Sequence, residues 1–318
     1  MRRTVASLGP ILGFSAAAVA VCFAQRVTEQ SSSHLASPLR PYALKLESFV
    51  PAPGSSAGVL LKARINGGRP LHLILDSGAE HVVISRSTAR VSGLAERSSL
   101  TLVGFGRVEE AGHLMVAQKL DVGPLSFRDF PVDVVDHKVL EGADGVVPLA
   151  LFSGFLVRLD FPAKVLDLTP YESGHASREG FTGAIFANAV LFVKTALDKL
   201  HEGYFLLDTG AAHNAVSRQT ALALGGPLFQ APARQVQGAS GSSEAPPIRP
   251  GVHFRMAGQE ITSNDVVMVD LDQMSRYNGV EVAGLLGYPA LRGFVVTVNY
   301  RDSLVKMETR GSSSAADH

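Results

Sequence analysis

Two apolar stretches of the chain each run into an aspartate. PLHLILDSG leads into Asp76 and GYFLLDTG leads into Asp208, and each stretch is bounded by Gly or Pro. Short apolar runs with such boundaries are typical of buried strands. Each is followed by a helix-compatible segment with Gly at or next to its end, SRSTARVSGL in the first case and SRQTALALGG in the second. The pattern therefore predicts a strand, a turn and a short helix, and predicts them twice.

Alternating apolar and polar positions predict further strands in both halves. Glycine-rich polar stretches, GFGRVEEAG from Gly104 and QGASGSSEAPP from Gln237, indicate hairpin tips or mobile loops. Strand-like segments follow each of them. Both halves then close on a segment with a period of two, FLVRLDFPAKVLDL in the first half and FVVTVNYRDSLVKM in the second. These two segments are predicted hairpins.

The two halves repeat one another in sequence. DSGAEHVVISRSTA begins at Asp76 and DTGAAHNAVSRQTA begins at Asp208, 208 − 76 = 132 residues later, and eight of the fourteen paired positions are identical. Two copies of so long a unit predict two homologous lobes, because a solenoid needs more and shorter repeats. The predicted organisation is a signal or anchor at 1–24, a linker at 25–42, lobe 1 at 43–175, lobe 2 at 181–309 and a disordered tail at 310–318.

The N-terminus has the composition of an export signal. Arg2 and Arg3 precede a run rich in Ala, Val, Leu and Phe up to Ala24, and a polar stretch rich in Ser and Pro follows. This order predicts an export signal or a single N-terminal membrane anchor, and hence a periplasmic or extracellular protein. Because little chain lies between Ala24 and lobe 1, we expect no pro-segment to mask the site.

The composition limits the partners and the kinds of reactive site that the protein can have. The chain is 46% hydrophobic and 18% charged, which is typical of a globular protein, and 29 basic residues balance 29 acidic ones. Nothing in that balance favours nucleic acid or an anionic membrane surface as a partner. Cys22, in the predicted signal or anchor, is the only cysteine. The two lobes therefore have no disulfide, no thiolate nucleophile and no thiolate metal site.

The repeated aspartates point to acid–base chemistry. If the lobes pair about a pseudo-twofold axis, Asp76 and Asp208 meet at the interface, where two close carboxylates cannot both ionise and so share a proton. One carboxylate then acts as general base on a water, and the protonated one polarises the scissile carbonyl. Such a reaction requires no metal and no other cofactor.

Asp-Ser-Gly-Ala at Asp76 and Asp-Thr-Gly-Ala at Asp208 resemble the active-site signature of retropepsin-like aspartic proteases, whose catalytic dyad is known to share a proton. Gly-Leu-Leu-Gly at Gly284 to Gly287 resembles that family's second signature. The resemblance covers nearly all of both lobes. It implies an all-β fold of two homologous acid-protease β-barrel lobes in one chain. It also implies an aspartic endopeptidase that acts as a monomer on a polypeptide and uses no cofactor.

The resemblance assigns roles by position. Asp76 and Asp208 would be catalytic, with Ser77 and Thr209 supplying hydroxyls that bond across the lobes. Gly78 and Gly210 would make the turns, and one or both of the loops near Gly104 and Gly238 would form flaps over the substrate.

One departure from the pattern keeps a second function open. Lobe 1 has Val146-Val147-Pro148 at the second signature, with Pro where Gly is expected. This change favours, weakly, a catalytically inactive protein of the same fold that binds peptides or proteins, whereas the presence of both acids favours the protease.

Two other pairs repeat with the acids. His81 and His213 lie at the same offset from each acid and could be metal ligands, but structural zinc usually has four protein ligands and no second cluster accompanies them. We interpret them as residues at the edge of the loop or relics of duplication. Arg86 and Arg218 could make a charge contact that tunes the site, and we interpret them as solvated helix starts.

Overall fold

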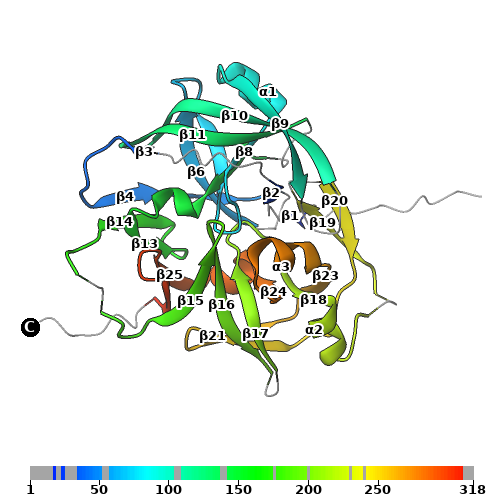
Figure 1. Cartoon of the computed structure of the whole chain (residues 1–318). Helices are drawn as coiled ribbons and strands as arrows, with labels where there is room; N and C mark the ends of the chain where they lie inside the picture. The colour runs from blue at the N-terminus through cyan, green and yellow to red at the C-terminus, as the bar shows by residue number, and fades with distance from the viewer. Residues whose placement is uncertain are drawn as a thin grey trace, which may run out of the picture.

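Almost all of the regular structure is β-strand, arranged as two strand-rich halves (Figure 1). The structure is a computed structural model, and it describes residues 17–18, 23–25, 34–51, 57–103, 109–136, 142–174, 177–198, 201–228, 231–238 and 241–310. The helices are short, so the predicted all-β class is confirmed.

Lobe 1 is built on a ten-stranded sheet whose path runs β2-β9-β10-β11-β8-β12-β7-β6-β5. Its strands after the N-terminal segment are β5 Glu47–Phe49, β6 Gly58–Ile65, β7 Leu71–Asp76, β8 Val82–Ser85, β9 Ala95–Val103, β10 Glu109–Val122, β11 Leu125–Val135 and β12 Gly145–Pro148. The helix α1 (Arg86–Val91) begins where predicted, because the Ser85 side chain accepts a hydrogen bond from the Thr88 N–H and caps it. A 3₁₀ turn, η2, covers Leu149–Phe152.

Lobe 2 repeats this arrangement. Its strands are β15 Thr182–Ala187, β16 Val190–Leu197, β17 His201–Leu207, β18 Asn214–Ser217, β19 Arg234–Gly238, β20 Gly241–Ala245, β21 Val252–Met256, β22 Gln259–Ser263, β23 Val266–Val269 and β24 Val282–Leu286. Its helices are α2 Arg218–Ala223, α3 Asp272–Asn278 and α4 Tyr288–Leu291. Ser217 caps α2 just as Ser85 caps α1.

The two lobes share one sheet at their junction. The predicted closing hairpins are confirmed as β13–β14 (Phe155–Asp160 and Val165–Pro170) and β25–β26 (Phe294–Asn299 and Leu304–Thr309). With β4 (Tyr42–Lys45) they form the order β4-β14-β13-β25-β26-β15, in which β13 pairs antiparallel with β25. Three strands from each half meet symmetrically at that pairing, as a pseudo-twofold axis requires.

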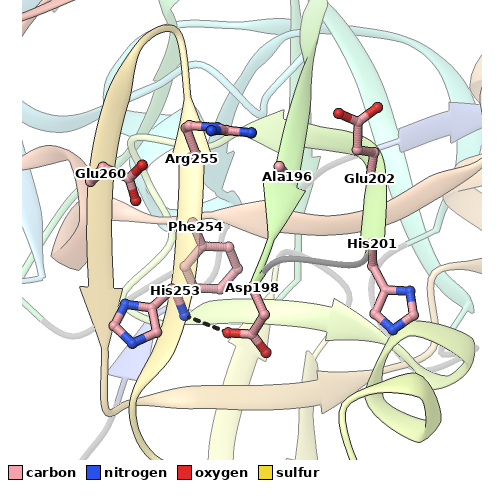
Figure 2. A pocket seen from close by; sticks show the side chains of 8 residues that line it. All are labelled: Ala196, Asp198, His201, Glu202, His253, Phe254, Arg255 and Glu260. Atoms are coloured by element: carbon pink, nitrogen blue, oxygen red, sulfur yellow. Dashed lines mark hydrogen bonds between the residues drawn. The ribbon is translucent and has the colours of Figure 1, made fainter.

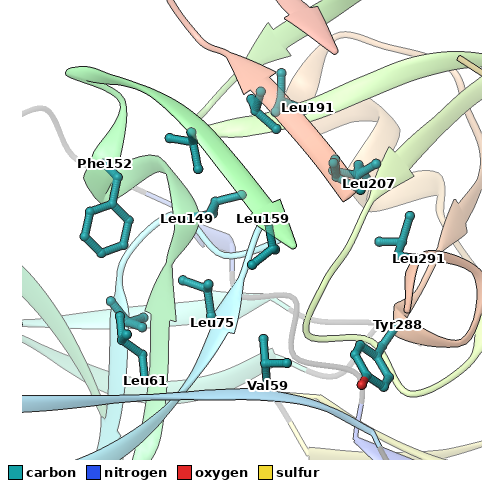
Figure 3. Packing of buried hydrophobic residues seen from close by; sticks show 14 of the residues in the cluster. Val59, Leu61, Leu75, Leu149, Phe152, Leu159, Leu191, Leu207, Tyr288 and Leu291 are labelled. Atoms are coloured by element: carbon teal, nitrogen blue, oxygen red, sulfur yellow. The ribbon is translucent and has the colours of Figure 1, made fainter. Parts of the chain in front are cut away.

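One continuous hydrophobic cluster contains buried side chains from both lobes (Figure 3). Leu75 and Leu207, the residues directly before the two acids, are fully buried in it. Val59 and Leu191 occupy corresponding positions on the preceding strand of each lobe. Because this cluster comes from both lobes, burial of its side chains holds the two acid-bearing strands in place.

The halves differ in strand continuity. The β10 and β11 strands of lobe 1 span 14 and 11 residues, whereas the lobe 2 counterparts are divided into β20–β21 and β22–β23. Pro246, Pro247 and Pro250 lie between β20 and β21. Proline cannot donate to a strand ladder, so the proline-rich stretch interrupts the long hairpin that lobe 1 retains.

Two short strands from the N-terminal segment pair with β19 and β9, which belong to the hairpins β19–β20 and β9–β10. Ala17–Ala18 (β1) pairs in parallel with β19, and Phe23–Gln25 (β2) pairs antiparallel with β9. A third, β3 (His34–Leu35), pairs with β11. The rest of the predicted signal or anchor and residues 311–318 of the predicted tail lie outside the described residues. Within the described part of the chain, no helix is long and apolar enough to span a membrane.

Candidate active site

The two acids stand at equivalent points of the two sheets. Asp76 is the last residue of β7 and pairs in parallel register with Pro148 of β12. Asp208 directly follows β17, whose neighbour β24 runs parallel to it, and the Asp208 N–H donates to the Leu286 carbonyl at 3.0 Å. Each acid is fully buried. The predicted strand–acid–turn unit therefore occurs in both lobes.

Four hydrogen bonds link the two turns across the lobes. The Ser77 hydroxyl donates to the Leu207 carbonyl and the Thr209 hydroxyl donates to the Leu75 carbonyl, both at 2.7 Å. Each hydroxyl also accepts from the other residue's backbone N–H, at 3.0 Å in both cases. Each predicted hydroxyl thus bonds to the partner lobe twice, and the pair fixes the position of one turn against the other.

Gly78 and Gly210 are required by close approach. A Cβ at Gly78 would lie 2.8 Å from the Asp208 carboxyl carbon, and a Cβ at Gly210 would lie 2.5 Å from the Asp76 carboxyl carbon. Neither glycine has a positive φ. The sequence-based reason, freedom to make a tight turn, is therefore incomplete, because each glycine leaves room for the opposing carboxylate.

The carboxylates are arranged as an asymmetric pair. Asp76 Oδ1 accepts from the Gly78 N–H at 2.6 Å, whereas Asp208 Oδ1 accepts from the N–H groups of Gly210 and Ala211 at 3.1 and 2.9 Å. Each Oδ2 is buried and has no hydrogen-bond partner among the described residues. Burial raises the pKa of Asp76 well above its ordinary value, with repulsion by Asp208 adding to the effect, and burial raises the pKa of Asp208 to about 7.

Comparison with known proteins agrees with this geometry. A family model described as aspartyl protease matches residues 61–149 and 193–290, more than half of the chain. The chain belongs to the aspartyl protease family. Each matched segment contains one acid and one second signature, so the family match follows the internal repeat. The predicted resemblance is confirmed.

The fold of this aspartyl protease family member also matches a solved structure. The crystal structure of the aspartic proteinase from Irpex lacteus aligns with a TM-score of 0.54 over 87% of this chain and 100% of that one, at 12% identity. At that identity the likeness shows the fold alone. A search of curated proteins returned no match.

Pro148 fits the loop that carries Asp76 in this family member. In lobe 2 the second signature ends in Gly287, whose buried N–H donates to the Asn214 side chain at 2.9 Å. Lobe 1 has Pro148 at the Gly287 position and Val82 at the Asn214 position. Proline has no N–H to satisfy, and valine offers no acceptor. The two exchanges compensate each other, so the departure at Pro148 leaves no buried donor unpaired at that position.

The repeated histidines pair with carboxylates. His81 Nδ1 lies 3.0 Å from Asp133 Oδ2 and His213 Nδ1 lies 2.7 Å from Asp265 Oδ2, each pair being 52 residues apart. No group of three His, Cys, Asp or Glu among the described residues could hold a metal ion. Each histidine lies five residues after its aspartate, and the equal spacing of the acidic partners was the signal that sequence alone offered for Asp133 and Asp265.

Arg86 begins α1 as predicted, but it is not simply solvated. Its side chain pairs with Asp136 and also contacts His113. Arg218 begins α2 in the same way.

A cavity of about 840 Å³ lies on the outer strands of lobe 2, and neither Asp76 nor Asp208 lines it (Figure 2). It is lined by Ala196, Asp198, His201, Glu202, His253, Phe254, Arg255 and Glu260. The polar side chains are spread over separate strands. The Asp198 carboxylate accepts hydrogen bonds from the His253 N–H and from the Arg249 side chain. They do not converge on one point as the residues around the dyad do, so we place the candidate site at the dyad.

Proposed function

We propose that the protein is an aspartic endopeptidase in which Asp76 and Asp208 activate a water molecule. One observation carries this proposal: two buried carboxylates from different lobes each have one oxygen fixed by backbone N–H groups and one oxygen without a protein partner among the described residues. Two oxygens left in this state can hold a water between them. The raised pKa values of both carboxyls favour a pair that keeps one proton into the neutral range.

The proposed reaction needs only this pair. The ionised carboxylate takes a proton from the water while the water oxygen attacks the scissile carbonyl carbon. The protonated carboxyl gives its proton to the carbonyl oxygen. The resulting gem-diol breaks its C–N bond as the leaving nitrogen takes the proton that one carboxyl holds and one gem-diol hydroxyl gives its proton to the ionised carboxylate. The products are a carboxylic acid and an amine, and the pair again holds one proton. The cross-lobe bonds of Ser77 and Thr209 hold both acids in place during these transfers.

The hairpins β9–β10 and β19–β20 support an extended polypeptide as the substrate. The edges of β9 and β19 already accept extended chain, since β2 and β1 pair with them. Main-chain pairing of this kind binds peptides with little dependence on their sequence. The expectation that no pro-segment masks the site concerns a chain cleaved after Ala24. In the uncleaved chain, β1 and β2 lie on the hairpin edges that a substrate would use.

The test compares wild type with Asp76→Asn and Asp208→Asn on a denatured protein at acidic pH, with and without a statine-type inhibitor. We expect the wild type to be inhibited and each variant to lose cleavage by a factor of about 10² or more. Circular dichroism would check that each variant is folded. Unchanged cleavage in either variant would overturn the dyad. Wild type that binds the denatured protein without cleaving it would support the inactive, peptide-binding alternative instead.

Export and a monomeric state are part of the same proposal. The basic and apolar N-terminus favours an exported or N-terminally anchored protein. One chain supplies both lobes, so no second copy is needed to complete the pair. Fractionation of expressing cells and light scattering of the purified chain would test these two points.

A further inference from the structure

A line of polar contacts connects the loop that carries Asp76 to lobe 2. It begins at His81, five residues after Asp76, whose Nδ1 lies 3.0 Å from Asp133 Oδ2. The His81 side chain is 8% exposed and that of Asp133 is 1% exposed. A contact so well shielded from water constrains the loop more than a surface ion pair would.

The line continues through Glu80 to the other lobe. Glu80 Oε1 lies 3.7 Å from His81 Nε2, and Glu80 Oε2 accepts a hydrogen bond from the Tyr277 hydroxyl at 2.7 Å. Tyr277 belongs to α3 of lobe 2 (orange in Figure 1), 197 residues away along the chain. The loop that carries Asp76 is therefore tied to a helix of the lobe that carries Asp208.

The lobe 2 end of this line is itself fixed. The Asn188 side-chain amide donates to the Tyr277 carbonyl at 3.1 Å and to the Asn278 side chain at 3.3 Å. Asn188 lies in the turn between β15 and β16, where its φ of 46° is one that asparagine tolerates. The C-terminal end of α3 is thus anchored to the strands of its own lobe.

Lobe 2 has no matching line among the described residues. His213 repeats the contact with a carboxylate, to Asp265, but Ala212 occupies the position of Glu80. His213 Nε2 is buried without a hydrogen-bond partner in the described part of the chain. The histidine–aspartate contact is thus duplicated, whereas the extension across the lobes is present in one direction only. A relic of duplication would not account for that extension.

We propose that Asp133, His81, Glu80 and Tyr277 form a cross-lobe tie that sets the separation of the Asp76 and Asp208 carboxylates. These four are positioning residues for the dyad, and the proposal rests on the proposed function in taking the dyad as the catalytic pair. The electrostatic coupling of two carboxylates weakens as they move apart. Loosening the tie should therefore reduce the coupling of the dyad.

The experiment follows the two carboxyl titrations by NMR of carbon-13-labelled aspartate in the full chain. Asp208 is the charged group that acts on Asp76, while His81 faces Asp133 and Glu80. Two coupled carboxyls lose their protons in two separated steps. In Tyr277→Phe and Glu80→Ala we expect the separation between the steps to shrink by about half a pH unit or more.

Two variants serve as controls. Glu80→Gln keeps an oxygen that can accept from Tyr277, so its two steps should stay closer to the wild-type values than those of Glu80→Ala. Tyr42→Phe removes a hydroxyl that donates to the Pro38 carbonyl, at the outer end of the shared sheet, and should leave the titration unchanged. Should Glu80→Ala fail to fold, Tyr277→Phe decides, because it removes one hydroxyl only.

The proposed tie would be overturned if the separation between the two titration steps in Tyr277→Phe stayed at the wild-type value. It would also be overturned if Tyr42→Phe changed that separation as much as Tyr277→Phe does. Cleavage assays of the same variants add a second readout: kcat should fall several-fold while KM stays within about twofold, since the tie aligns the reacting groups and does not bind substrate. The titration needs no substrate, so a wild type that cleaves nothing would overturn the proposed function and leave the tie standing.

Discussion

The loops that carry Asp76 and Asp208 are held by different supporting residues. In lobe 2 a glycine at the second signature keeps its N–H, and Asn214 accepts from it. In lobe 1 Pro148 removes the donor, and Val82 takes the place of the acceptor. The comparison teaches that a buried backbone group can be satisfied or removed with equal effect, and that the position must be read together with its partner.

The loops also differ in what they contact. Glu80 of lobe 1 reaches Tyr277 of lobe 2, whereas Ala212 of lobe 2 packs with the apolar residues around Ala79 and Val83. Lobe 1 therefore makes a polar contact across the junction at this position, and lobe 2 makes an apolar one. Substitutions at four kinds of position test how far the two halves are equivalent.

The largest effect is expected at the glycines that face the opposing carboxylates. Gly210→Ala should lower cleavage by on the order of 100-fold or more, because its Cβ displaces the Asp76 carboxyl. Gly78→Ala should do the same to a lesser degree, since the contact there is 2.8 Å instead of 2.5 Å. Steady-state kinetics would measure both. Gly293→Ala is the matched control, because a Cβ there meets nothing within 4 Å.

The cross-lobe hydroxyls come next. Thr209→Val and Ser77→Ala each remove two hydrogen bonds at buried sites, one to a backbone carbonyl and one from a backbone N–H. Each should lower the free energy of unfolding by about 2–4 kcal/mol. Thr195→Val removes one bond, to the Val193 carbonyl within the same strand, and should cost about 1 kcal/mol. Urea denaturation compares the three. A loss at Thr209 no larger than that at Thr195 would contradict the prediction.

The dyad should make stability depend on pH. The pKa of Asp208 is raised from 3.8 to about 7 in the folded protein, so the folded state binds more protons than the unfolded state across that range. The free energy of unfolding should therefore fall as pH rises from about 4 to about 7.

Asp208→Asn removes this dependence in part. The variant should be more stable than wild type by on the order of 2 kcal/mol at pH 7, with the difference gone near pH 4. Melting temperatures over this pH range would show it. Asp129→Asn, an exposed site with the same change of charge, is the control. If the difference between Asp208→Asn and wild type stayed constant over this range, a raised pKa at Asp208 would be ruled out.

The smallest effect concerns the compensated pair of lobe 1. Val82→Asn places an amide opposite a proline without an N–H, and Pro148→Gly exposes an N–H to a valine without an acceptor. Each should destabilise the fold, and the double variant should be less destabilised than the sum by about 1 kcal/mol. A double-mutant cycle by denaturation measures that coupling. Simple additivity would mean that the two positions are independent.

Much of the fold and of the site could be predicted from the sequence. The strands that lead into Asp76 and Asp208, the short helices after them and the closing hairpins all followed from local periodicity and turn residues. The hairpins β9–β10 and β19–β20 flank the predicted glycine-rich stretches, whose tips at 104–108 and 239–240 lie outside the described residues. The contacts of Glu80 and Asn214 could not be predicted, because they join residues 197 and 73 positions apart. For Asp133 the sequence offered only the equal 52-residue spacing from the repeated histidines.

The sequence by itself determined that the chain is an all-β protein of two related lobes, each with one copy of a repeated phrase that begins with an aspartate. Those features depend on patterns a few residues long and on a repeat that is visible in the letters. Only the tertiary structure decided that Pro148 is compensated by Val82, that Gly78 and Gly210 are needed for the opposing carboxylates, and that Glu80 contacts Tyr277. The physical reason is that these are contacts across sheets and lobes, and which side chains meet there is set by packing, which no local pattern records.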